Sequence, residues 1–273
     1  MMPKVSDILE ICKEIAPPIL CEEYDNAGLL VGDVHQEVGG ILLALDLRKD
    51  VIQEAVEKGA NLLITHHPVL FSPTQRLVED GGEISNIRRL IQCGISHIAM
   101  HTNLDAVDDG ICDVLCRRLG IENPQRLTNA SDEALIELGV PMGYGRIGTV
   151  KEQPLAQFAR MVRDALEAEC VQYAGEGDKI IQRVAVASGS GASVAEEAYR
   201  KGADCLVTGE IRHHLALEYV QRGMAMVDAG HYDTEKVILP ILQERLQSAL
   251  FALNYNVHVL LTKTETGIFT QVG

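Results

Sequence analysis

The stretch ILLALDLRKDVIQEAVEKGANLLITHHP, residues 41–68, decides the fold class. It begins with a short apolar run that ends at Asp46, followed by a segment with helical spacing of apolar residues that ends at Gly59. A second apolar run, Leu62 to Thr65, leads directly into His66 and His67. A strand, a helix and a second strand in this order predict a βαβ unit with parallel strands.

The same alternation continues on both sides of the central part of the chain. Helices are predicted at residues 83–94, 108–120 and 154–168, with Pro154 at the first position of the last one, and strands at 96–100 and 146–150. Strands separated by helices predict an α/β fold with mixed, largely parallel sheets in a three-layer α/β/α arrangement.

The first pattern recurs later in the chain. The segment VAEEAYRKGADCLVTGE, residues 194–210, matches VIQEAVEKGANLLITHH, residues 51–67, at an offset of 202 − 59 = 143. Gly59 and Ala60 then align with Gly202 and Ala203, and Thr65 aligns with Thr208. This match predicts two related α/β halves. The alternative is that βαβ units resemble one another without a duplication.

Composition restricts the classes of partner. Of the 273 residues, 4% are aromatic and none is Trp, and the net charge is −15. Such a chain repels nucleic acid and anionic membranes, so we expect neither as a partner. No apolar run approaches the roughly 20 residues that span a bilayer. The seven cysteines form no CxxC pair, which favours free thiols in the cytoplasm.

Three groups of metal-ligand residue types follow predicted strands. They are His66 with His67, His101 with Asp105 in HTNLD, and His231 with Glu235 in GHYDTE. Ligands of α/β sheets bind beyond the carboxyl ends of strands. Imidazole and carboxylate together suit Zn, Fe, Mn, Ni or Co.

These residues are more numerous than one catalytic zinc needs. Two divalent metal ions would use them better, with Asp105 and Glu235 as bridges and His66, His67 and His231 as terminal ligands. Adjacent histidines face opposite sides of a regular strand, so the pair needs a turn, which Thr65 and Pro68 bracket. The alternative for each histidine is a hydrogen-bonded structural role without metal.

Five motifs resemble one known family. DNAGLLVGD (25–33), residues 44–71, MHTNLDA (100–106), VTGEIRHHLALEY (207–219) and DAGHYDTE (228–235) closely resemble the Nif-three-like dinuclear metal-centre proteins, also described as type 2 homologs of GTP cyclohydrolase I. The resemblance runs in the same order from near the N-terminus through Glu235. The C-terminal LLTKTETGIFTQVG, residues 260–273, departs from the family's endings.

The resemblance implies a ligand set and an assembly. His66, His67, Asp105, His231 and Glu235 match the family's metal ligands, and His101 matches another histidine of the metal pocket. It also implies two similar, interlinked α/β domains with the metal site in the cleft between them, and a homohexamer. We expect the first domain to comprise residues 1–125 with 236–273, and the second to comprise residues 126–235.

The main functional hypothesis is a metal-dependent hydrolase similar to a type 2 GTP cyclohydrolase. It would act on a purine nucleotide or related small molecule through a metal-bound hydroxide. His101 or His214 would pass protons to the leaving nitrogen, and Arg76 and Arg212 would meet a phosphate. The alternative is a non-enzymatic protein that stores or delivers metal, or serves as a scaffold.

Overall fold

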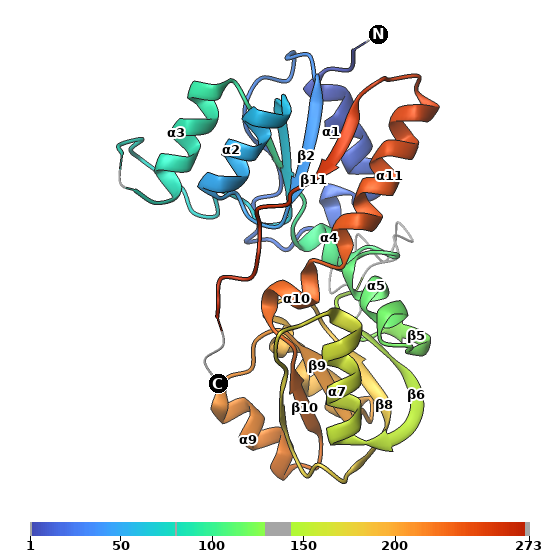
Figure 1. Cartoon of the computed structure of the whole chain (residues 1–273). Coiled ribbons are helices and arrows are strands. Elements are labelled where there is room, and N and C mark those ends of the chain that lie inside the picture. Colours follow the sequence, from blue (N-terminus) through green and yellow to red (C-terminus); the bar gives the residue numbers. More distant parts are fainter. Residues whose placement is uncertain (1, 80, 129–142, 271–273) are drawn as a thin grey trace. The chain divides into compact units, whose positions relative to one another are not determined.

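A computed structural model describes residues 2–79, 81–128 and 143–270. The chain folds into two compact units (Figure 1). Unit 1 comprises Met1–Leu104 and Leu239–Thr266, and unit 2 comprises Asp105–Ile238 and Gly267–Gly273. The chain thus leaves unit 1 after its fourth strand, builds unit 2 and returns, which links the two units covalently at several points.

Unit 1 is built on a five-stranded sheet with the order β1-β4-β3-β2-β11. Strands β11, β2, β3 and β4 are parallel neighbours, and β1 pairs antiparallel with β4. The elements are α1 (Val5–Ile15), η1 (Pro18–Leu20), β1 (Gly28–Val31), β2 (Gly40–Ala44), α2 (Lys49–Lys58), β3 (Leu62–Thr65), α3 (Glu83–Cys93), β4 (Ser96–Ala99), α11 (Ile238–Ala252) and β11 (His258–Leu261).

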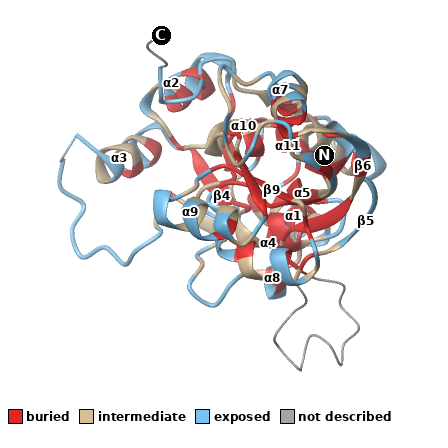
Figure 2. Ribbon diagram, turned by 90° about the horizontal axis from the view of Figure 1, so that it is seen from below, coloured by how far each residue is buried: buried red, intermediate tan, exposed pale blue. Residues whose placement is uncertain are grey.

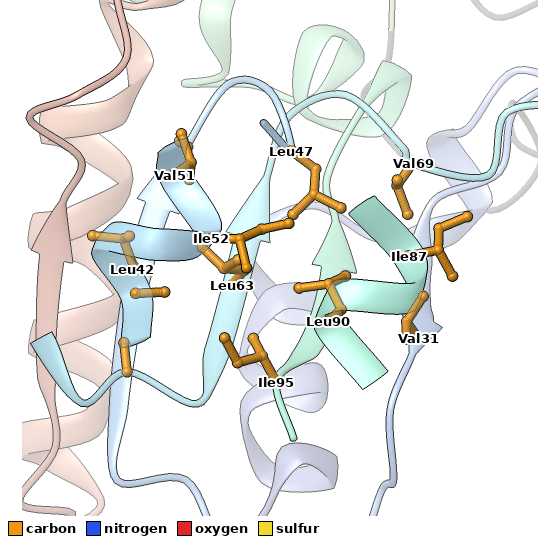
Figure 3. Packing of buried hydrophobic residues seen from close by; sticks show 13 residues of the cluster. Val31, Leu42, Leu47, Val51, Ile52, Leu63, Val69, Ile87, Leu90 and Ile95 are labelled. Atoms are coloured by element: carbon orange, nitrogen blue, oxygen red, sulfur yellow. The ribbon is translucent and has the colours of Figure 1, made fainter. Parts of the chain in front are cut away.

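Helices cover both faces of this sheet, with α2 and α3 on one side and α1 and α11 on the other (Figure 1). Leu42 and Leu63 point toward Ile52 of α2 and Leu90 of α3, in a core of fully or nearly fully buried side chains (Figure 3). Because both faces are covered, β3 is buried at every position and has a continuous apolar sequence without alternation.

Unit 2 is built on a six-stranded sheet with the order β5-β6-β8-β9-β10-β7. Strands β8, β9 and β10 are parallel, and the other neighbouring pairs are antiparallel. The elements are α4 (Thr102–Ala106), α5 (Ile111–Arg118), β5 (Glu122–Arg126), β6 (Arg146–Pro154), α7 (Leu155–Leu166), β7 (Gln172–Ala174), β8 (Ile180–Val186), η2 (Gly191–Val194), α8 (Ala195–Arg200), β9 (Cys205–Thr208), α9 (His213–Gln221), β10 (Ala225–Asp228) and α10 (His231–Glu235).

The predicted repeat is present in the packing of the two units. Seven core residues of unit 1 correspond, at the offset of 143, to seven core residues of unit 2. They are Leu42, Ala44, Val51, Ile52, Ala55, Ala60 and Leu63, matched by Ala185, Ala187, Val194, Ala195, Ala198, Ala203 and Leu206. The two units are therefore similar α/β domains, as the sequence predicts.

Backbone details repeat as well. Gly59 and Gly202 both adopt left-handed φ angles, of 69° and 75°, after the helix that precedes the second strand. Only a residue without a Cβ takes this conformation at low cost. Burial is concentrated in strands such as β4 and β9, whereas α9 and the outer faces of α2 and α3 are largely exposed (Figure 2).

One local prediction was displaced by one residue. Pro154 is the residue before α7, with extended φ and ψ angles, rather than its first helical residue. It also ends β6, where it lies opposite Ile180 of β8 in the antiparallel register. The long strand β6 therefore runs directly into α7, and proline suits this junction because it needs no backbone N–H there.

Candidate metal centre

The side chains of His66 and His67 do not point to opposite faces of the sheet, as successive side chains within strand β3 do. The backbone N–H groups of His66 and His67 still donate to Ala44 and Leu45 of the neighbouring chain segment, at 3.3 and 2.9 Å. The Thr65 hydroxyl donates to the His67 carbonyl at 2.6 Å and bends the chain. The two ring centroids are only 4.9 Å apart, so both rings lie on the same side.

A third histidine completes a cluster in unit 1. His101 follows β4, and its ring centroid lies 5.1 Å from that of His66 and 5.7 Å from that of His67. One ring nitrogen of each residue lies within 4.8 Å of the others. We call these three residues the histidine cluster. It lies beyond the carboxyl ends of parallel strands, where α/β proteins bind their ligands.

Hydrogen bonds orient the first two rings. His66 Nδ1 lies 2.8 Å from the Met100 carbonyl oxygen, and His67 Nδ1 lies 2.8 Å from Asp46 Oδ1. A carbonyl oxygen only accepts, so Nδ1 of His66 carries the hydrogen, and an ionised Asp46 favours the same tautomer for His67. The lone pair of each ring is then on Nε2, which is how proteins prepare imidazole as a metal ligand.

Asp25 holds the third ring in the same way. His101 Nδ1 lies 2.7 Å from Asp25 Oδ1, and the other carboxylate oxygen accepts from the Thr102 backbone N–H and hydroxyl at 3.0 and 2.5 Å. Burial disfavours ionisation of Asp25, but the hydrogen bonds from His101 and Thr102 outweigh it and hold its pKa well below the usual range. Asp25 is therefore an ionised acceptor at neutral pH and orients the His101 ring.

Unit 2 carries a second group, on the short helix after β10. His231 and Glu235 lie one turn apart on α10, and His231 Nε2 is 3.1 Å from Glu235 Oε1. His231 Nδ1 lies 2.8 Å from Glu210 Oε1. We call His231 and Glu235 the His231–Glu235 pair. Glu210 orients the ring of this pair as Asp46 orients His67.

Two glycines allow the chain to pass close to this pair. A Cβ on Gly189, whose φ is +52°, would lie 2.1 Å from Glu235 Oε1 and 3.1 Å from His231 Nε2. A Cβ on Gly209 would lie 2.7 Å from His231 Cα. The absence of a side chain at these two positions therefore allows close packing against the His231–Glu235 pair.

Asp105 is fixed from within unit 2. The buried Ser188 hydroxyl donates to Asp105 Oδ1 at 2.5 Å, and the Tyr144 hydroxyl donates to the Ser188 carbonyl at 2.5 Å. Burial, and then the charge of Asp105, raise the pKa of Tyr144 well above its usual value. Tyr144 is therefore a neutral hydrogen-bond donor that braces the turn from which Ser188 reaches Asp105.

The donor chemistry of both groups suits divalent transition metals. The histidine cluster presents three imidazoles whose Nδ1 atoms are engaged by oxygen acceptors. Unit 2 presents the imidazole of His231 and the buried carboxylates of Asp105 and Glu235. Nitrogen and oxygen donors of this kind bind Zn, Fe, Mn, Ni or Co. The residues present therefore fit the metals that the sequence predicts.

Other predicted polar residues lie apart from these groups in the chain. His214 is exposed on α9, next to the exposed His213, and Arg76 and Arg212 are exposed in loops. Among the described residues, the groups able to hold a metal include neither of the α9 histidines. The proton-transfer role of His214 and the phosphate contacts of the two arginines stay predictions.

Three further residues of metal-ligand type are buried in the core, apart from these groups. Cys112 and Cys116 are buried on α5, and burial raises the pKa of the Cys116 thiol to about 12. His97 is fully buried in β4, with Nε2 at 2.7 Å from Thr65 Oγ1. Because the Thr65 proton goes to the His67 carbonyl, His97 Nε2–H is the donor, and this core histidine supports the turn of the cluster.

Sequence reasoning assigned no orienting role to Asp46, Glu210 or Ser188. Each of them lies two residues after the last residue of a strand. The repeat contained a usable signal, because the offset of 143 pairs His67 with Glu210 and Asp46 with Gly189. In each unit, a polar residue at this strand end contacts a predicted ligand or is one, because His67 is a predicted ligand and Glu210 contacts His231.

The fold and these groups define a class: a protein of two similar α/β domains whose strand ends carry histidines and carboxylates suited to metal. The family model Duf34/NIF3 (NGG1p interacting factor 3) matches residues 3–267. The chain belongs to this family.

Relatives and solved structures match this chain over nearly its whole length. A GTP cyclohydrolase 1 type 2 homolog of Clostridium acetobutylicum is 35% identical over 264 residues, which are 96% of this chain and 97% of that protein. A hypothetical protein of Staphylococcus aureus has a TM-score of 0.92 at 31% identity, with 100% of both chains covered. A Bacillus cereus protein related to NIF3 has a TM-score of 0.92 at 25% identity, with 99% of both chains covered.

Within residues 2–79, 81–128 and 143–270, no helix has the length and apolar character needed to cross a bilayer.

Proposed function

We propose that this protein is a dinuclear metal-dependent hydrolase that acts on a purine nucleotide or a related small molecule. Two divalent metal ions would be held by His66, His67, Asp105, His231 and Glu235. The proposal joins the side chains of both candidate groups with the name of the curated relatives, GTP cyclohydrolase 1 type 2 homolog. It also places the protein in the cytoplasm, which the seven free cysteines support.

The observation that carries the proposal is the anchoring of the histidine cluster. Three rings, each with one nitrogen within 4.8 Å of a nitrogen of the other two, are each held at Nδ1 by an oxygen acceptor. A structural histidine needs one partner, whereas three converging rings with their outer nitrogens fixed are typical of a metal site. When bound, the metal ions would acidify water and polarise an oxygen of the substrate.

The chain's own residues then have distinct roles. Met100 and Asp46 fix the two adjacent rings, and Ser188 fixes Asp105. His101, oriented by ionised Asp25, can hold or release a proton at Nε2, so it suits transfer to a leaving nitrogen. His214 is the second candidate for this transfer.

The test is elemental analysis of the untagged native protein, with turnover of GTP and other purine nucleotides assayed on the same sample. We expect about two transition-metal ions per chain together with product release. Metal without turnover on any purine nucleotide would contradict the hydrolase and favour metal storage, delivery or scaffolding. Absence of metal after reconstitution would contradict both.

A matched pair of variants sharpens the test. The His66→Ala/His67→Ala double variant should lose most bound metal while remaining folded by circular dichroism. The His213→Ala/His214→Ala double variant removes another adjacent pair, exposed on α9, and should keep its metal. A fall in turnover in the second variant, with metal intact, would assign the proton transfer to α9. The predicted homohexamer is tested on the same samples by light scattering.

A further inference from the structure

The segment that follows β11 is fastened to unit 1. Strand β11 pairs with β2, and Thr262 N continues this pairing by donating to Leu43 O at 2.9 Å. The chain then runs beyond the carboxyl end of β2. We call residues 262–266 the C-terminal strap.

Two buried carboxylates fasten this strap. Glu54 on α2 accepts from the Thr262 hydroxyl at 2.7 Å and from the Lys263 N–H at 3.0 Å. Glu265, which is 7% exposed, points the other way and accepts from the backbone N–H groups of Leu45 and Asp46, at 2.8 and 2.7 Å. Each oxygen of Glu265 thus holds one of two consecutive amides.

One of the two amides that Glu265 binds belongs to Asp46, which orients the predicted ligand His67. Asp46 carries the carboxylate that receives the Nδ1 hydrogen of His67 at 2.8 Å. The neighbouring carbonyl of Leu45 accepts the His67 backbone N–H at 2.9 Å. Glu265 therefore holds the backbone of the two residues, Leu45 and Asp46, that set the position and the ring orientation of His67.

We propose that Glu265 is a positioning residue for the histidine cluster: it fixes the Leu45–Asp46 backbone, and through Asp46 it fixes the Nδ1–H tautomer and orientation of His67. The metal-binding consequence rests on the proposed function. The positioning itself does not, because hydrogen bonds in the metal-free protein carry it. Groups that accept the outer N–H of a ligating histidine, as Asp46 does for His67, contribute about 10- to 100-fold to metal affinity, and Glu265 acts on that contribution through Asp46.

The experiment measures two properties of the full chain, wild type and Glu265→Gln. Glutamine has a single acceptor oxygen and turns an N–H group toward the second amide, so it cannot replace both contacts. In the metal-free protein, ring ¹⁵N shifts should show the Nδ1–H tautomer of His67 in wild type and its loss in the variant. Zn²⁺ affinity, measured by chelator competition, should fall about 10-fold or more.

Two further variants separate positioning from general destabilisation. Asp46→Asn should lower the Zn²⁺ affinity similarly, and adding Glu265→Gln to it should cause little further loss, because both act through His67. Asn61→Ala breaks contacts to Gly39 and Glu37 at the opposite end of the sheet and should lower stability without changing the His67 tautomer. If Glu265→Gln fails to fold, Glu265→Asp keeps both oxygens on a shorter side chain and should give an intermediate loss.

The outcomes distinguish the two proposals. An unchanged His67 tautomer in folded Glu265→Gln, or the same tautomer change in Asn61→Ala, would overturn the positioning role. A wild-type protein that binds no Zn²⁺ would overturn the proposed function, while the tautomer comparison would still decide whether Glu265 positions His67.

Discussion

Ser188 Oγ donates a 2.5 Å hydrogen bond to Asp105 Oδ1 and thereby ties the turn after β8 to helix α4. Both residues are buried, with exposed fractions of 1% and 7%. A buried carboxylate that is oriented before a metal binds loses less freedom on binding. Ser188 therefore orients Asp105 as Asp46 orients His67.

Replacing Ser188 by Ala should lower metal affinity about 10- to 100-fold, because the Asp105 carboxylate loses its oriented donor. Chelator competition with Zn²⁺ measures this change. Ser190→Ala, at an exposed position two residues further along the same turn, is the control and should bind as wild type does. Equal affinities for the two variants would show that the Ser188 contact does not prepare Asp105.

Replacing Gly189 by Ala should remove metal binding by the His231–Glu235 pair, since the new Cβ would lie 2.1 Å from Glu235 Oε1. Gly202→Ala is the matched control. Its φ of +75° carries the same left-handed penalty, about 1 kcal/mol, but no atom lies within 4 Å of the added Cβ.

Metal stoichiometry and urea unfolding, measured on both glycine variants, separate the two effects. Both should be destabilised, and only Gly189→Ala should lose metal. Full metal content in Gly189→Ala would mean that the pair moves freely or binds no metal.

Stability should depend on pH through His97. Burial lowers the pKa of His97 from 6.5 to about 3, so the folded protein keeps this ring neutral. Below pH 6.5 the unfolded chain takes up a proton that the folded chain refuses. The contribution of His97 to stability is therefore intact above pH 6.5 and lost as pH falls toward 3, by up to about 1.4 kcal/mol per pH unit.

Urea unfolding of metal-free protein between pH 7 and pH 4 measures this slope. The side chain at position 97 cannot titrate in His97→Gln. A plot of its unfolding free energy against pH should therefore be less steep than that of wild type, by the slope of up to about one proton taken up on unfolding, whatever the stability of the variant at pH 7. The same slope in wild type and variant would show that another group controls acid unfolding.

The sequence predicted the parts of the molecule whose signals are local. Helices α2, α3 and α5 and strands β2, β3, β4, β8 and β9 have clear apolar patterns, and the glycine at position 59 recurs at 202. The predicted ligands stood out because histidine and carboxylate occur shortly after the buried strands β3, β4 and β10.

Other features have no local signal. Strand β5 has the sequence ENPQR and is almost wholly exposed, and it exists because β6 offers an edge to pair with. Glu265 lies 219 residues from Asp46 in the chain, and only folding brings its carboxylate to that amide. Support for a ligand depends on such long-range contacts, so residue type and spacing cannot reveal it.

Among the ion pairs of unit 2, the one that the buried guanidinium of Arg146 forms with Asp113 should be the most sensitive to substitution. It binds Asp113 through two bonds of 2.8 Å and also donates to the carbonyl oxygens of Gly143 and Gly145. Only 3% of its side chain is exposed. Arg146→Met leaves the Asp113 carboxylate, which is 16% exposed, without its partner and should lower the free energy of unfolding by about 3–5 kcal/mol.

The exposed pair Arg117–Asp109, with exposed fractions of 53% and 66%, is the matched control. Arg117→Met should change stability by less than about 1 kcal/mol, because water screens that pair. Combining Arg146→Met with Asp113→Leu should recover part of the loss, since no unpaired charge then remains buried. Urea unfolding of these variants decides the matter: similar losses for Arg146→Met and Arg117→Met would show that the buried network contributes no more than a surface pair.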